Sequence, residues 1–342
     1  MSATSELTID FWDVGQADCT VITLPDGRLI LLDVGRRGSP VVDWLVERRP
    51  PAQIAAIVLT HNHADHAGAM PAIVANHQSS IGAVWMLQDR PIKDPTFAKV
   101  FRSVDEAEAR GCFRVRRLED GQEIWRDDQL KLRLHVLYPT FTSNVRHMGY
   151  PNQTSGLIVL DYGDKRLCAW PGDLPLATVA DQLRASRPEL LHGPHHGGPE
   201  DFKTDKARSR QAVKDLSPRI SFISVGTTNT YSHPKPGYLA LLAASGCRVV
   251  CSEVTNACDR WHLKNSVPVF DGSAALGLRS SRSGSPCRGA WRVTVKEGAL
   301  IPDRFTDEHA TRVTSLKRPQ CLKGMGWRSG EPSPWAKDAS GD

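Results

Sequence analysis

The sequence predicts an α/β layered fold with both parallel and antiparallel strand pairs. Apolar strand-like runs alternate with helical segments in two successive blocks, which is the pattern of helices packed on sheets. In each block, two neighbouring runs are joined by a short turn: Pro25-Asp26-Gly27 in the first and Gly163-Asp164 in the second. Such hairpins pair strands antiparallel, which argues against a purely parallel, doubly wound sheet.

The first block contains five expected strands and three expected helices. Ile54–Thr60 is a short apolar run, typical of a strand buried on both faces. Val41–Arg49 has helical periodicity and stops before Pro50-Pro51, because proline cannot continue a helix. We expect strands at 7–13, 19–24, 28–33, 54–60 and 81–87, and helices at 41–49, 67–77 and 97–110.

The second block repeats this organisation. Leu130–Tyr138 alternates apolar and polar residues, as a half-buried strand does. The segment 202–216 has the pattern of one basic helix, with Lys203, Lys206, Arg208, Arg210 and Lys214 along it. We expect strands at 130–138, 156–162, 166–170, 220–225 and 248–254, and helices at 177–186, 202–216 and 237–244.

The character of the chain changes after Asp271. Residues 1–271 form the predicted main domain. Residues 272–302 form an irregular extension rich in Ser, Gly and Arg, in which Trp291–Lys296 has the pattern of a final strand. Residues 303–342 have little apolar pattern and many charges, Gly, Ser and Pro, so we expect a weakly ordered tail.

Composition sets few limits on function. The chain has 342 residues, a formal net charge of +5 and eight cysteines. This mildly basic balance allows a polyanionic partner, although ordinary solvated Lys and Arg give the same value. The polar start of the sequence shows no secretory signal, and no apolar run reaches the roughly 20 residues that span a bilayer. We therefore expect a soluble, cytoplasmic protein without membrane insertion, with reduced thiols or a metal cluster rather than disulfides.

One short loop carries the strongest chemical signal. His61, His63, Asp65 and His66 directly follow an apolar strand, where a helix begins. Imidazole and carboxylate are the usual ligands of Zn(II) and similar ions. In an extended segment His61 and His63 project to one side and can hold one ion, while Asp65 and His66 can reach a second. Two ions about 3.5–4 Å apart can hold a bridging hydroxide and polarise a phosphoryl or carbonyl oxygen. A chance cluster of three His in six residues is the weaker explanation.

This loop resembles the HxHxDH signature of the metallo-β-lactamase superfamily. More specifically, residues from about Phe11 to Ser252 are similar to the metallo-β-lactamase domain of the competence protein ComEC, without its membrane channel. The resemblance rests on seven segments in the same order. They are Asp13-Val14-Gly15-Gln16-Ala17-Asp18, Leu31-Leu32-Asp33-Val34-Gly35, Thr60–His66 with Gly68, Asn152-Gln153-Thr154-Ser155, Pro171-Gly172-Asp173, His195-His196-Gly197-Gly198, and Ser224-Val225-Gly226 with Asn229-Thr230-Tyr231-Ser232-His233-Pro234.

The resemblance implies an αββα sandwich, two mixed sheets flanked by helices, with two divalent ions, Zn(II) or Mn(II), at one edge. It makes 1–271 the hydrolase domain. His61 and His63 would bind the first ion, Asp65 and His66 the second, and Asp173 both. Either His195 or His196 would complete the second site, and the sequence does not choose between them.

Further residues are candidates for support or substrate contact. Asp13, Asp18 and Asp33 lie at strand ends or turns and either orient the ligand histidines or serve local hydrogen bonding. Ser155 and Asn229 belong to the matching segments, and we assign them to the same supporting set.

Asn152 stands where many members of the superfamily have a third His on the first ion. Asn is a poorer ligand for Zn(II), so the first site is expected to be weaker, open or filled by a harder ion such as Mn(II), unless nearby His147 substitutes. His233 is expected to contact a substrate phosphate or to protonate the leaving group.

A second, structural zinc site is an alternative for the late cysteines. Cys251, Cys258, His262 and Cys287 offer four donors, although their spacing is not a standard zinc motif. Buried or unpaired thiols are the simpler interpretation.

These features predict a metal-dependent hydrolase that uses a metal-bound hydroxide. A phosphodiesterase or nuclease acting on DNA is favoured by the ComEC-like pattern and by the basic helix 202–216, which could line a phosphate path. A hydrolase of small esters, lactones or thioesters is the alternative, because a fold does not fix a substrate. A metal-stabilised subunit that binds beside a protein partner in a DNA-processing complex is a third.

Overall fold

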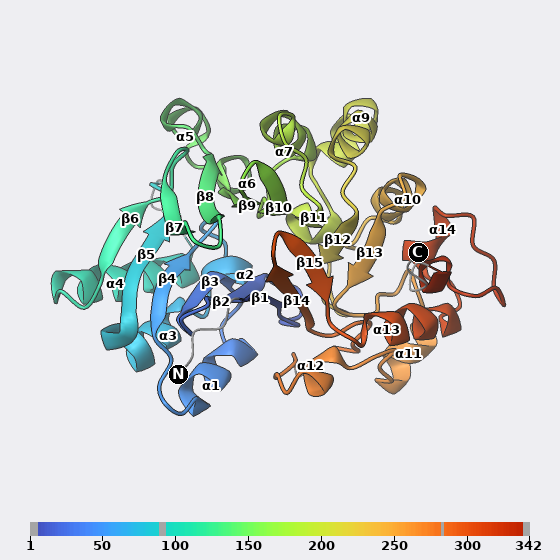
Figure 1. The fold of residues 1–342 in the computed structure, drawn as a ribbon, viewed down its shortest axis with the longest axis horizontal. Coiled ribbons are helices and arrows are strands. Elements are labelled where there is room, and N and C mark those ends of the chain that lie inside the picture. The colour runs from blue at the N-terminus through green and yellow to red at the C-terminus, as the bar shows by residue number, and fades with distance from the viewer. Residues whose placement is uncertain (1–5, 89–93, 282–283, 338–342) are drawn as a thin grey trace.

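Two β-sheets lie face to face in the computed structural model, with helices covering both outer surfaces (Figure 1). The structure describes residues 6–88, 94–281 and 284–337, apart from the side chains of Lys203, Ala336 and Lys337. The prediction of an α/β sandwich with two mixed sheets is confirmed.

The first sheet has eight strands. Its parallel half runs through β3, β4, β5 and β6, and its antiparallel half through β3, β2, β1, β14 and β15. In spatial order the strands are β15 (Ala299–Pro302), β14 (Trp291–Lys296), β1 (Leu7–Phe11), β2 (Cys19–Thr23), β3 (Leu29–Val34), β4 (Ile54–Val58), β5 (Ile81–Met86) and β6 (Arg114–Arg117).

The second sheet has seven strands. β10 to β13 pair in parallel, and β7 to β10 pair antiparallel. In spatial order the strands are β13 (Arg248–Cys251), β12 (Ile220–Ile223), β11 (Leu190–His192), β10 (Lys165–Trp170), β9 (Leu157–Tyr162), β8 (Leu132–Tyr138) and β7 (Glu123–Asp127).

Helices fill the outer layers and the connections. The longer ones are α1 (Pro40–Glu47), α3 (Met70–His77), α4 (Pro95–Ala109), α7 (Leu176–Leu183), α9 (Lys206–Leu216) and α10 (Pro236–Ala244). The shorter ones are α2 (Ala64–Ala67), α5 (Phe141–His147), α6 (Pro151–Thr154), α8 (Asp201–Thr204), α11 (Arg260–Asn265), α12 (Gly272–Ala275), α13 (Thr306–Arg312) and α14 (Gln320–Lys323). Four 3-10 turns are η1 (Gln78–Ser80), η2 (Pro194–Gly197), η3 (Val313–Ser315) and η4 (Pro334–Lys337).

Three apolar clusters correspond to the three contacts between these layers. The middle cluster joins the inner faces of the two sheets, where Phe11 stacks near Trp170 and Trp291. One outer cluster packs α1, α3 and α4 on the first sheet, and the other packs α7, α9 and α10 on the second. The apolar patterns of the strands predict these buried sheet faces. Their burial provides the main driving force for the layered fold.

Two predicted helices are each divided in the structure. The segment 67–77 begins earlier, with α2, and α3 follows after Gly68-Ala69. The segment 202–216 breaks at Asp205, whose side chain accepts a hydrogen bond from Arg208 N and so caps a new helix, α9. A side chain that caps a helix competes with helix continuation, and periodicity alone does not reveal it.

The final strand predicted at Trp291–Lys296 forms, as β14, whereas the tail differs from the expectation of weak order. β14 pairs along its length with β1, so the first sheet includes residues from 272–302. In the described part of the tail, Val313, Leu322 and Trp335 are buried in the outer cluster of the second sheet. These apolar residues are too widely spaced to form a periodic pattern, yet each fits against α10 or its neighbours.

In the described chain no helix combines the length and apolarity needed to cross a bilayer.

Candidate metal centre

The histidine-rich loop begins where β4 leaves the sheet. β4 is buried along almost its whole length, and the chain then turns so that His63 occupies the N-cap position of α2. Asp65 and His66 therefore lie in the first turn of a helix, while His61 precedes it. This change from strand to helix directs the loop's four potential ligands toward one region, as the sequence predicted.

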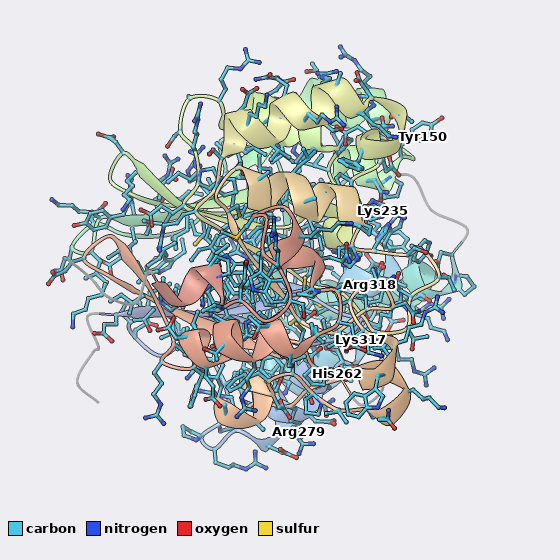
Figure 2. The ribbon with its side chains drawn as sticks, turned by 90° about the vertical axis from the view of Figure 1, so that its right-hand side faces the viewer. Tyr150, Lys235, His262, Arg279, Lys317 and Arg318 are labelled. Atoms are coloured by element: carbon cyan, nitrogen blue, oxygen red, sulfur yellow. The ribbon has the colours of Figure 1, made fainter. Side chains whose placement is uncertain are left out.

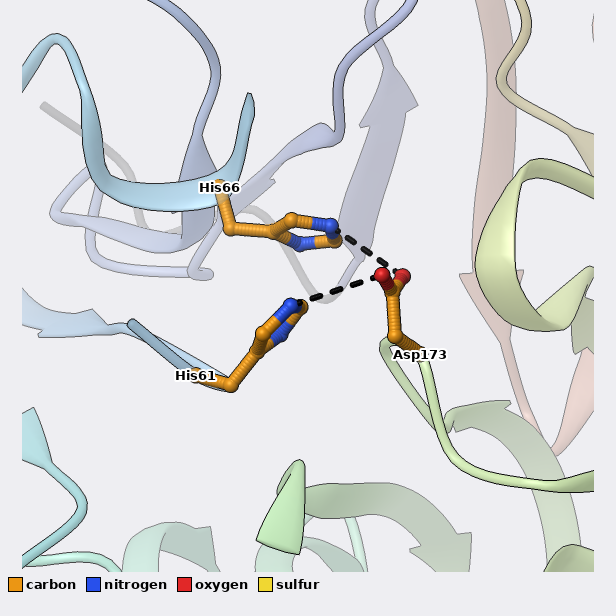
Figure 3. A group of neighbouring side chains, drawn as sticks. All are labelled: His61, His66 and Asp173. Atoms are coloured by element: carbon orange, nitrogen blue, oxygen red, sulfur yellow. Dashed lines mark ion pairs between the residues drawn. The ribbon is translucent and has the colours of Figure 1, made fainter. Parts of the chain in front are cut away.

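Asp173 lies at the centre of these side chains. Its Oδ2 is 3.4 Å from His61 Nε2 and 4.0 Å from His63 Nδ1, while its Oδ1 is 3.2 Å from His66 Nε2. Figure 3 shows His66 above His61 on one side of this carboxylate, each ring pointing at one of its two oxygens. A carboxylate between two sets of imidazoles is suited to bridging two cations.

A glycine allows Asp173 to reach this position. Gly172 follows β10 in a left-handed conformation with φ of +53°, and a Cβ there would lie 2.2 Å from Ser155 Oγ. The same Ser155 hydroxyl accepts a hydrogen bond from Asp173 N at 3.1 Å and lies 3.2 Å from His61 Nδ1. Ser155 therefore connects the central carboxylate with a ligand histidine, in the supporting role predicted for it.

The side chains of His195 and His196 reach different parts of the centre, although both residues have positive φ values near +50°. His196 is buried, with Nε2 3.5 Å from Asp65 Oδ2, and it belongs to a group of converging donors with Asp65 and His66. Its Nδ1 donates to Ser224 O at 3.0 Å, so Nε2 is the nitrogen that can bind a cation, once the cation displaces its proton. His195 instead reaches Asp173 Oδ2 at 3.5 Å, on the side of His61 and His63.

Carboxylates behind the histidines fix their orientation. Asp33 Oδ2 lies 2.7 Å from His66 Nδ1, and Asp18 Oδ1 lies 3.1 Å from His196 Nδ1. Thr60 donates from its hydroxyl to Asp33 at 2.8 Å, and the same hydroxyl is 3.2 Å from His61 Nδ1. Such partners hold the ring and its tautomer in the form that binds a metal.

The electrostatics of the centre suit a divalent cation. Burial lowers the pKa of His61 to about 4, and His66 adds to this shift, so the ring is neutral near pH 7. Burial alone would raise the pKa of Asp173, but His66 and His61 hold it well below its ordinary value. Burial also lowers the pKa of His196, yet Asp18 and Asp65 more than reverse this and raise it to about 10. The carboxylates therefore leave a surplus of negative charge.

Three buried polar atoms of the centre also fit a bound cation. Within the described chain, His66 Nε2, His196 Nε2 and Asp173 Oδ1 are buried without a hydrogen-bond partner. Buried polar atoms are normally paired, and a cation would satisfy all three. The residues present therefore fit a metal centre.

A cavity of about 670 Å³ opens above this centre. Apart from Ala64 and Gly198 its lining is polar or charged. Its walls are formed by Gln16, Arg36, His63, Ala64, Asp65, Asp94, Asn152, Asp173, His195, His196, Gly198, Glu200, Thr230, Tyr231 and His233.

Asn152 lines the cavity but contacts another side chain. It donates from Nδ2 to Glu200 Oε1 at 2.7 Å. His147, the suggested substitute for a third histidine, ends α5 and does not belong to the described lining of the cavity.

His233 also faces the cavity, with its ring centroid 5.1 Å from that of His195. Burial, reinforced by His195 and His196, lowers its pKa to about 3. Asn229 positions this loop, because it accepts from His233 N and donates to His233 O and thus acts on backbone.

Some predicted residues lie outside the centre. Asp13 is buried beside Glu253, and burial together with this second carboxyl raises its pKa well above the ordinary value. Of the two roles expected for Asp13, the structure shows local hydrogen bonding, because its Oδ1 accepts from Gly15 N at 3.4 Å. The basic helix α9 lies in the outer layer, and no described residue of it lines the cavity (Figure 1).

The predicted structural zinc site does not form among the described residues. Their groups of converging metal-binding atoms include no cysteine. His262 Nδ1 lies 3.2 Å from Asp259, while Cys287 Sγ lies 3.6 Å from His309. Burial, with Cys287, Cys321 and Cys258 nearby, raises the pKa of the Cys251 thiol well above its ordinary value. These thiols are free, and all but the half-buried Cys258 are buried.

Several residues of the site were not found from the sequence. Thr60 had a signal, because it immediately precedes His61, but its hydroxyl contact depends on the fold. His192 comes within 3.7 Å of Asp18, and Arg36 within 3.5 Å of Asp65, from distant parts of the chain. Glu200 and Tyr231 are recognised only as parts of the cavity wall.

Comparison with known proteins agrees with this geometry. Residues 12–170 match the model of the metallo-beta-lactamase superfamily. The chain is 24% identical over 294 residues to ComE operon protein 3 of Bacillus subtilis, a match that covers 78% of this chain and 34% of that longer protein.

Two solved structures are similar in part. The novel metallo hydrolase Igni18 of Ignicoccus hospitalis has a TM-score of 0.44 at 15% identity, over 71% of this chain and 95% of that one. The metallo-beta-lactamase fold protein YhfI of Bacillus subtilis has a TM-score of 0.43 at 10% identity, over 71% and 95%. The family match over residues 12–170, the sandwich of two mixed sheets and the His/Asp centre together identify a metallo-β-lactamase domain in this chain.

Proposed function

We propose that this protein is a metal-dependent phosphodiesterase that acts on DNA or related phosphodiesters. The observation that carries the proposal is the polar cavity centred on Asp173. A pocket for small esters or lactones is expected to be narrow and mainly apolar. The cavity here has a volume of about 670 Å³, and its mostly polar wall carries the Arg36 guanidinium and the neutral His233 ring beside the candidate ligands, which provides hydrogen-bond donors for an anionic substrate. DNA as the substrate is favoured by the ComEC-like sequence pattern, and the similarity to ComE operon protein 3 is consistent with that pattern.

The ligand groups suggest how two ions would be held. His61 and His63, with Asp173 Oδ2, form one set, and His195 reaches the same oxygen. The His195 imidazole would therefore serve the first ion, to which Asn152 offers no imidazole. Asp65, His66 and His196, with Asp173 Oδ1, form the other set. Divalent ions there, Zn(II) or Mn(II), would supply Lewis acidity and lower the pKa of water.

The remaining steps fall to side chains of the cavity. Asp65 is held by Arg36 at 3.5 Å and by His196 at 3.5 Å, and it orients the attacking water. His233 contacts the scissile phosphate or the leaving oxygen from the opposite wall. Gly198 leaves room for this ring, since a Cβ there would lie 2.2 Å from His233 Nε2.

Hydrolysis of bis(p-nitrophenyl) phosphate and of single-stranded DNA tests the proposal, with protein reconstituted in Mn(II) or Zn(II). Asp65→Asn should abolish turnover of both while the circular dichroism spectrum stays unchanged. Asp94→Asn is the matched control, because Asp94 lines the same cavity but belongs to no ligand group.

Turnover that persists in Asp65→Asn would refute the assigned role. Hydrolysis of p-nitrophenyl esters or lactones without any phosphodiester turnover would refute the substrate class. Absence of all turnover with metal bound would indicate a binding subunit that acts with a partner.

A further inference from the structure

A basic and aromatic surface lies on α11 and on the loop before α14. We call it the α11 patch and define it as Arg260, Trp261, Lys264, Lys317 and Arg318, all of which are exposed. The Trp261 side chain is 53% exposed, which is unusual for so large an apolar group. In Figure 2, Lys235, Arg318, Lys317 and His262 follow one another from top to bottom in the right half of the face turned to the viewer.

One buried carboxylate brings the two segments of the patch together. Asp259 is 4% exposed, and it accepts hydrogen bonds from Trp261 N at 2.8 Å and Lys317 N at 3.1 Å. Arg318 N donates to Cys258 O at 3.0 Å, which adds a backbone link. The nearest acid is thus engaged with backbone groups and with His262, so it does not compete at the surface.

The basic side chains of the patch keep their charge available. Considering the chain as far as it is described, no carboxylate lies within the 4.0 Å ion-pair distance of Arg260, Lys264, Lys317 or Arg318. Many other surface arginines are paired, such as Arg208 with Asp181 and Arg279 with Glu47. Unpaired cations beside an exposed indole form a surface suited to a polyanion that also has flat apolar faces.

A series of backbone and helix contacts connects the cavity wall with the segment that carries Arg318. Lys235 N donates to Gly197 O in the histidine loop, and Lys235 Nζ donates to the carbonyl of Tyr231 at the cavity wall. α10 starts at the next residue, and α14 packs closely on it, since a Cβ on Gly324 would lie 2.1 Å from Ala240 O. Arg318 lies just before α14. A path therefore runs from Tyr231, 58% exposed, to the α11 patch.

We propose that the α11 patch binds a single strand of nucleic acid whose scissile phosphodiester lies in the cavity. The inference rests on the proposed phosphodiesterase function. The cations contact backbone phosphates, and Trp261, followed toward the cavity by Tyr231, stacks on unpaired bases. A duplex hides its base faces, so the exposed aromatic rings favour a single strand.

Binding of a fluorescent 20-residue oligonucleotide to the full chain, measured by anisotropy as single strand and as duplex, tests this proposal. Trp261→Ala should weaken single-strand binding about tenfold, the loss of one stacked base. Lys317→Glu with Arg318→Glu should reduce the slope of log K against log salt by about 1.4, the value for two phosphate contacts on a single strand. Lys99→Glu with Arg114→Glu, exposed on the α4 and β6 side of Figure 1, is the charge-matched control.

The outcomes separate this inference from the proposed function. Patch variants should hydrolyse bis(p-nitrophenyl) phosphate like the wild type, because the small substrate does not reach the patch. If the variants bind and cleave single-stranded DNA with unchanged Kd and KM, or if binding prefers duplex, the patch inference is wrong and the function stands. If binding depends on the patch but no phosphodiester is cleaved, the function is wrong and the surface stands. Trp261-dependent binding to phosphatidylserine vesicles without binding to DNA would overturn the nucleic-acid assignment.

Discussion

Replacing Asp303 with Asn should destabilise the protein strongly, because Asp303 neutralises a buried arginine. Arg288 has a fully buried side chain, and Asp303 is only 7% exposed. Arg288 Nη2 donates to both oxygens of Asp303, at 2.7 and 2.6 Å, and Nη1 donates to Ala290 O at 2.9 Å. Removing one partner of a buried ion pair costs about 3–5 kcal/mol, since the other charge remains uncompensated.

Urea unfolding followed by tryptophan fluorescence measures this loss directly, with metal content matched between proteins. Asp307→Asn is the control, because Asp307 is 59% exposed and its ion pair with Arg248 at 3.7 Å should contribute less than about 1 kcal/mol. Adding Arg288→Met to Asp303→Asn should recover much of the loss, since no buried charge then remains. If Asp303→Asn and Asp307→Asn unfold alike, the buried pair does not stabilise the start of the tail as we argue.

Three further predictions concern the centre and acid stability. His196→Ala should remove one equivalent of bound metal, measured by mass spectrometry after dialysis, whereas His195→Ala should weaken the other equivalent; the reverse result would exchange their assignments. Gly198→Ala should lower kcat with unchanged metal content, because its Cβ displaces the His233 ring; a normal kcat would contradict the placement of that ring. Burial, with Arg288 and Arg248 nearby, lowers the pKa of His309 to about 3 from 6.5, so the unfolded chain binds more protons between these values. Its contribution is complete above pH 6.5 and is lost as the pH falls, by about 2 kcal/mol at pH 5. Stability measured at pH 7.5 and 5 should thus fall more in the wild type than in His309→Gln, and equal losses would refute this.

Local patterns were sufficient for most of the fold. The strands around His61 and the alternating β8 follow from residue spacing, because each buries a face that its own sequence defines. Capping by Asp205 and the pairing of β14 with β1 were missed, since each depends on one side chain or on a distant strand. The tail was misjudged for a similar reason: Val313 and Trp335 contribute single contacts to a core built by other segments.

The sequence by itself determined the chemistry of the centre, because four of its candidate ligands lie within six residues of one loop. Only the tertiary structure decided how distant groups complete it: Asp173 between the histidines, His196 beside Asp65 and His195 beside Asp173. It also decided between the alternatives left open for Asp13, which makes a local hydrogen bond, and for the late cysteines, which are free thiols. The physical reason is that spacing along the chain fixes neighbours within one turn or strand, whereas packing of two sheets decides which strand ends meet.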